Sequence, residues 1–94
     1  MFILNLTYTK PNTEVEKFLP KHIAFLEKYY ATEKFICSGR KNPRTGGIIL
    51  CNVQNIDEVN AIVKEDPFYK GKIASYEIIE FLPTKYISNL KPFI

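Results

Sequence analysis

Residues Glu65–Gly71 read EDPFYKG and place two acidic side chains where a helix is expected to end. Pro67 disfavours the helical conformation of the residue before it, so the preceding helix is predicted to stop at Asp66. The last turn of a helix carries partial negative charge, which makes an acid there unfavourable by up to about 1 kcal/mol. Asp66 therefore needs another explanation, either hydrogen bonds to the Pro67-Phe68 turn or a partner elsewhere in the fold.

Patterns of apolar residues on both sides of this stretch predict the element order βαββαβ. The predicted elements are a strand over 2–9, a helix over 14–30, strands over 34–39 and 46–53, a helix over 55–66 and a strand over 72–81. Right-handed crossovers put both helices on one face of a four-stranded, mainly antiparallel sheet. The predicted fold class is thus α+β, a ferredoxin-like sandwich.

The first helix holds the only histidine of the chain. A stripe of apolar side chains at helical spacing is predicted to be its buried face: Leu19, Ile23, Leu26 and Tyr30. Pro20 lies inside the pattern, so the helix either kinks there or its regular part begins there. In the second case His22 would lie in the first turn.

A single domain over 1–94 is predicted, with a core over 2–81 and a tail over 82–94. The run Ile48-Ile49-Leu50 is apolar throughout, which indicates that both faces of its strand are covered. We therefore expect a homodimer in which two sheets pack face to face, with the tail on its own or the partner subunit.

Composition and charge narrow the classes of function. The chain is 46% apolar, and its net charge of +3 comes from scattered residues, which does not indicate nucleic-acid binding. The strand over 46–53 also lacks the aromatic residues of RNA-recognition domains. Without a long apolar stretch or a signal-peptide pattern, a cytoplasmic protein is expected. Cys37 and Cys51 have no metal-ligand spacing and are interpreted as small apolar strand residues, with a redox role left open.

His22 and Asp66 are the candidate catalytic residues, because adjacent helices on one sheet face could bring them together. A carboxylate that orients an imidazole supports proton transfer near neutral pH. The alternatives are a structural histidine and an aspartate that only bonds its own turn. Because a carboxylate at a helix C-terminus is not placed to support the fold, Asp66→Asn is expected to change stability little, and a loss above about 2 kcal/mol would show that the turn bonds of Asp66 dominate.

Weaker candidates for substrate binding carry polar groups on strands: Tyr8, Ser38, Arg40, Ser75 and Tyr76. Arg40, together with Lys41 and Arg44, could attract an anionic substrate, although a basic turn is more often simply solvated.

Two motifs, Pro20-Lys21-His22 and Asp66-Pro67-Phe68, followed by a glycine and the last strand, resemble the YCII-related family of small bacterial proteins. The resemblance covers 2–81 and implies a dimeric α/β-barrel fold with a catalytic His and Asp in a cleft, here His22 and Asp66. This chain has Gly39-Arg40 where the family usually has Gly-Pro, which puts a positive side chain near the cleft mouth.

The expected function is acid/base chemistry of isomerase or lyase type on a small organic molecule, with no cofactor and no metal. The alternative is a non-catalytic module that binds a small ligand or a partner in the same cleft. Haem ligation by His22 has no supporting signature beyond one imidazole.

Overall fold

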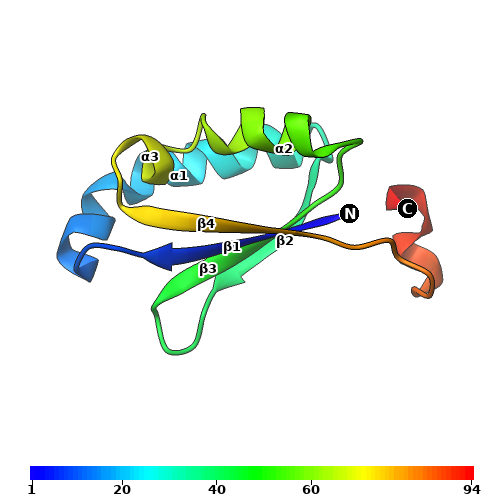
Figure 1. The fold of residues 1–94 in the computed structure, drawn as a ribbon, viewed down its shortest axis with the longest axis horizontal. Helices are drawn as coiled ribbons and strands as arrows, with labels where there is room; N and C mark the ends of the chain where they lie inside the picture. The colour runs from blue at the N-terminus through cyan, green and yellow to red at the C-terminus, as the bar shows by residue number, and fades with distance from the viewer.

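The computed structural model describes all residues, 1–94, and confirms the predicted fold class (Figure 1). The elements follow one another as β1 (Phe2–Tyr8), α1 (Asn12–Ala31), β2 (Phe35–Arg40), β3 (Gly46–Cys51), α2 (Ile56–Val63), α3 (Pro67–Lys70), β4 (Ala74–Glu80) and the short 3-10 helix η1 (Ser88–Phe93). The order βαββαβ is therefore confirmed, with α3 inserted before the last strand.

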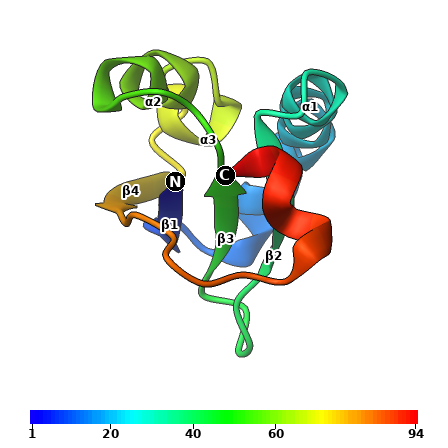
Figure 2. The same ribbon diagram turned by 90° about the vertical axis from the view of Figure 1, so that its right-hand side faces the viewer.

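The sheet has the strand order β2-β3-β1-β4, and every neighbouring pair is antiparallel. All helices except η1 lie on one face, α1 over the β2 side and α2 with α3 over the β4 side (Figure 2). The helix-facing residues of β1 alternate as predicted, since Phe2, Leu4 and Leu6 are buried. They form the centre of the core, on which α1 and α2 pack.

The helix α1 runs without interruption through Pro20, so the interpretation that its regular part begins there is wrong. His22 lies in the middle of the helix rather than in the first turn. The buried side chains are Val15, His22, Phe25 and Tyr29. The predicted stripe is only partly covered, and Ile23 is 45% exposed, because this flank borders a cavity described below.

The predicted second helix is divided in two at the Glu65–Gly71 stretch. α2 begins at the predicted cap, where the Asn55 side chain accepts the Glu58 N–H at 3.0 Å, and it ends at Val63. α3 then begins at Pro67, a residue suited to a first helical position. Asp66 is therefore the N-cap of a new helix and not the end of the preceding one.

The sheet face opposite the helices has no covering layer in the single chain and carries both apolar and polar side chains, with Asn5, Thr7, Ser75 and Glu77 among the polar ones. Pairing register and alternation place Ile3, Leu50 and Ile79 together on this open face. The tail leaves the end of β4 and extends beyond the sheet (Figure 1), with Leu82 79% and Ile87 72% exposed. None of the helices is long and apolar enough to cross a membrane.

Candidate active site

Both acids of the Glu65–Gly71 stretch bind side chains of α1. The Glu65 carboxylate accepts hydrogen bonds from Lys28 Nζ and from the Tyr29 hydroxyl, each at 2.6 Å. The Lys28 ammonium, and then the Tyr29 hydroxyl, hold the pKa of Glu65 below its usual value. Asp66 binds His22, about two turns earlier along α1. The junction between α2 and α3 is thereby tied to α1, which explains two acids at this position.

Asp66 accepts hydrogen bonds from three directions. Its Oδ1 caps α3 by accepting the Phe68 N–H at 2.9 Å and lies 2.8 Å from His22 Nδ1. Its Oδ2 accepts the hydroxyl of Tyr76, from β4. The Asp66 side chain has no solvent exposure, so these donors take the place of water around the carboxylate. The two interpretations left open by the sequence, turn bonds and a histidine partner, both hold.

The contact with Asp66 sets the chemistry of the imidazole. A carboxylate only accepts hydrogen bonds, so a neutral His22 carries its proton on Nδ1 and keeps the lone pair on Nε2. Nε2 makes no hydrogen bond with another group of the chain. The ring also stacks on Phe68, with centroids 3.9 Å apart and planes within 5°, which fixes its orientation. Nε2 is therefore a proton acceptor on a ring that Asp66 and Phe68 hold in place.

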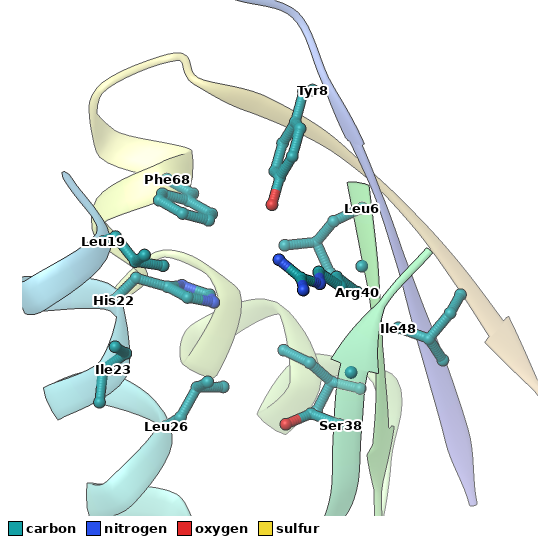
Figure 3. Close-up of a pocket in the computed structure, with 13 residues that line it drawn as sticks. Leu6, Tyr8, Leu19, His22, Ile23, Leu26, Ser38, Arg40, Ile48 and Phe68 are labelled. Atoms are coloured by element: carbon teal, nitrogen blue, oxygen red, sulfur yellow. The ribbon is translucent and has the colours of Figure 1, made fainter. Parts of the chain in front are cut away.

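The imidazole points into a cavity of about 230 Å³ between α1 and the β2–β3 side of the sheet (Figure 3). Mostly apolar side chains form its walls. The lining residues are Leu6, Tyr8, Leu19, His22, Ile23, Leu26, Ser38, Gly39, Arg40, Gly47, Ile48, Ile49 and Phe68. Because Ile23 on its α1 wall is 45% exposed, the cavity is open to solvent.

The structure brings most, but not all, of the predicted site residues to this cavity. Tyr8, Ser38 and Arg40 line it with His22. Tyr76 lies behind it and contacts Asp66. Ser75 is on the open face of the sheet, paired with Thr7, and so is not near the cavity. No group of three or more His, Cys, Asp or Glu side chains is placed to hold a metal ion.

Sequence reasoning missed the apolar walls and the role of Phe68. The walls include Leu19, Ile23 and Leu26, which the helical pattern assigned to the core. Phe68 follows Asp66 by two residues, as the cap geometry requires, and its ring supports the imidazole. The Asp-Pro-Phe motif was the signal that could have indicated this role.

The chain shares its fold with solved structures of other proteins. Among them is 5-chloro-2-hydroxyhydroquinone dehydrochlorinase from Burkholderia phenoliruptrix AC1100, in complex with 2,5-dihydroxybenzoquinone. The match has a TM-score of 0.69 and 21% sequence identity, and it covers 87% of this chain and 94% of the other.

Comparisons of the sequence with curated proteins and with family models give two further results. No curated protein matches the chain in sequence. The model of the YCII-related domain, in contrast, matches residues 1–82, which include β1 through β4 and both residues of the buried pair. The chain therefore belongs to the YCII-related domain family.

Proposed function

We propose that the cavity is the active site of a small-molecule enzyme in which His22 transfers protons and Asp66 orients it. The observation that carries the proposal is the imidazole itself. One ring nitrogen is held by a buried carboxylate, while the other is free on the wall of an open, apolar cavity. A positioned base of this kind typically accelerates proton transfer by about a hundredfold to ten-thousandfold.

The proposed reaction begins when Nε2 takes a proton from a C–H bond next to a carbonyl group. The electron pair of that bond moves into the carbonyl system and forms an enolate. In an elimination, a leaving group on the neighbouring carbon then departs with its bonding electrons. In an isomerisation, the imidazolium returns the proton to another carbon. Asp66 keeps the imidazole oriented in both cases, because its Oδ1 lies 2.8 Å from Nδ1.

The dehydrochlorinase with the same fold supports the elimination branch, since its name states the loss of chloride from a hydroxyhydroquinone. That support concerns the class of reaction, and the substrate of this chain is not taken from it. The second candidate is a binding module in which the same cavity holds a small ligand without turnover. It is favoured by the apolar walls, which suit binding as well as catalysis.

Deuterium exchange separates the two candidates. Phenylpyruvate and its methyl ester carry an acidic C–H next to a carbonyl, and NMR in D₂O follows the loss of that proton. The wild type is expected to accelerate exchange of at least one, and His22→Gln to lower the acceleration by about a hundredfold or more. The matched control is Lys21→Gln, an exposed neighbour on α1, which should keep the wild-type rate.

Two results of this experiment contradict catalysis. One is the absence of any acceleration by the folded wild type. The other is the same exchange rate for His22→Gln as for the wild type, which would show that another group takes the proton. Either result would leave the non-catalytic binding module as the remaining candidate function.

We also propose that the chain forms a homodimer through the open face of the sheet. This face carries Ile3, Leu50 and Ile79 without cover, and an apolar surface of this kind is typical of an interface. A cytoplasmic location, expected from the sequence, stays a prediction.

The dimer prediction has a matched pair of variants. Ile79 on the open face and Ile56 on α2 are 43% and 44% exposed. Ile79→Asp is expected to shift the sedimentation coefficient from that of a dimer to that of a monomer, and Ile56→Asp is not. A monomeric wild type, or equal behaviour of the two variants, would contradict this interface.

The cysteines give a second readout of the same interface. Cys37 is exposed in the single chain, whereas Cys51 is buried and burial raises its pKa to about 11. Cys51 is therefore expected to stay unreactive to thiol reagents at neutral pH until the chain unfolds. Cys37 should react more slowly in the dimer than in Ile79→Asp.

A further inference from the structure

The cavity contains one charged group whose role the acid/base proposal does not use. We propose that Arg40 binds the carboxylate of the substrate, so that the substrates are small organic acids with one negative charge on an apolar ring or chain. This inference rests on the proposed function, since it places the same substrate against His22. It adds the chemical class of that substrate and a residue that selects it.

The Arg40 guanidinium is free of protein partners. It points from β2 into the cavity, towards His22 and Tyr8 (Figure 3). The ion pairs of the chain are Lys17–Glu14, His22–Asp66, Lys28–Glu65, Lys34–Glu58 and Arg44–Glu16, and Arg40 is in none of them. It also makes no side-chain hydrogen bond, unlike Ser38, which accepts the Tyr30 hydroxyl at 2.6 Å. Its donors are therefore available to a ligand.

The charge around the cavity favours an anion. None of its lining residues is acidic, and the Asp66 carboxylate that binds His22 is fully buried. A neighbouring hollow shares Arg40 and is also lined by Lys41, Asn42 and Arg44. Glu16 pairs with Arg44, but Lys41 is in none of the ion pairs, so the hollow keeps a positive charge besides that of Arg40. Positive charge of this kind raises the rate at which anions arrive.

The chemistry of the walls narrows the anion to a small carboxylate. A guanidinium presents a planar fork of donors that matches the two oxygens of a carboxylate. One guanidinium balances one negative charge, whereas a doubly charged phosphate ester would carry an unbalanced charge into apolar surroundings. A volume of about 230 Å³ also lies below the range of drug-sized pockets, which indicates a small ligand.

In this arrangement the substrate lies between its two functional contacts. Arg40 on β2 holds the carboxylate, Leu19 and Leu26 on α1 face the apolar body, and Nε2 of His22 reaches the acidic C–H. Arg40 also stabilises the negative charge that develops when the proton leaves, because that charge spreads towards the bound end of a conjugated acid. Arg40 thus discriminates between a charged acid and its neutral analogue.

Benzoate and benzamide test the proposal, since they share shape and differ in charge. Binding to the intact chain is followed by chemical-shift changes of the His22 ring and of the cavity methyl groups. The wild type is expected to bind benzoate at least about tenfold more tightly than benzamide, and Arg40→Met to remove that preference. Arg40→Lys should keep part of it. Lys21→Met is the matched control, because Lys21 is an exposed cation that does not line the cavity, and it should retain the preference.

Three outcomes would overturn the proposal. They are equal affinity of the wild type for benzoate and benzamide, no benzoate binding at millimolar concentration, and an unchanged preference in Arg40→Met.

The outcome of the deuterium-exchange experiment does not depend on these binding results, so a failure of the acid/base function can be told from a failure of the anion site. If Arg40→Met removes the benzoate preference while the wild type exchanges no protons, Arg40 binds anions in a cavity without catalysis. If exchange is catalysed but Arg40→Met affects phenylpyruvate and its ester equally, the acid/base function stands and the anion site does not.

Discussion

Replacing Asp66 with alanine is expected to lower the free energy of unfolding by about 3 to 5 kcal/mol, because the change leaves buried donors on three elements without an acceptor. These donors are the Phe68 N–H, the His22 imidazole and the Tyr76 hydroxyl. The Asp66 side chain has no exposure, so water does not replace the carboxylate without rearrangement of α3. Urea unfolding followed by circular dichroism measures the loss.

Asparagine at the same position separates charge from shape. Asp66→Asn keeps a side-chain oxygen that accepts the Phe68 N–H or the His22 proton, but its amide nitrogen does not accept the Tyr76 hydroxyl. We expect a smaller loss, about 1 to 2 kcal/mol, and a mixture of imidazole tautomers visible in nitrogen chemical shifts of His22. This replaces the expectation of little change, which assumed that Asp66 ends a helix.

Glu65→Ala is the matched control for both changes. Glu65 precedes Asp66 and also binds α1, but its side chain is 41% exposed and its contacts are those of a surface ion pair. Its removal is expected to cost no more than about 1 kcal/mol. If Asp66→Ala costs no more than Glu65→Ala, the buried hydrogen bonds of Asp66 do not stabilise the fold.

The order of helices and strands could be predicted from the sequence, because each element has its own local pattern of apolar and capping residues. Alternation over 2–9 identified the helix-facing side of β1, and Asn55 with Glu58 identified the start of α2. Asp66 was more difficult, because an acid before proline suits both the end of one helix and the start of the next. An aspartate at this position can cap α3 alone, or it can cap α3 and also bind a histidine. Only the position of His22 on α1 shows that Asp66 does both.

Helical periodicity on α1 did not distinguish the core from a cavity. Leu19, Ile23 and Leu26 have the spacing of a buried stripe, but they line an open cavity whose opposite wall is the sheet. Both environments select apolar residues. The pattern therefore predicts which face of the helix is turned towards the sheet, and not whether the space between them is filled.

The neighbours Ser75 and Tyr76 show a second kind of error. Both were candidates for polar groups in the cleft, with an ordinary place on the strand as the favoured alternative, but adjacent strand residues point to opposite faces of a sheet. The register settles which of them faces the helices, since Tyr76 pairs with buried Leu6 and Ser75 pairs with exposed Thr7. Strict use of the two-residue period would have excluded one of the pair without a structure.

Gly46→Ala is the second change expected to have a large effect. β1 and β3 lie so close at Gly46 that a Cβ atom there would overlap the backbone carbonyl of Leu6. A backbone atom in a sheet does not move aside as a side chain does, so the two central strands must separate. We expect a loss of about 3 kcal/mol or more, measured by urea unfolding, and weaker ligand binding, because Leu6 and the adjacent Gly47 both line the cavity.

Gly39→Ala is the matched control, because a Cβ at Gly39 would meet no atom within 4 Å in the single chain. A strand glycine replaced by alanine in open space is expected to keep or slightly raise stability, since alanine restricts the unfolded chain. Equal stabilities for the two variants would mean that β1 and β3 accommodate the extra carbon by a small shift. A larger loss for Gly46→Ala, with a parallel loss of benzoate binding, would show that the close pairing of β1 and β3 shapes the floor of the cavity opposite His22.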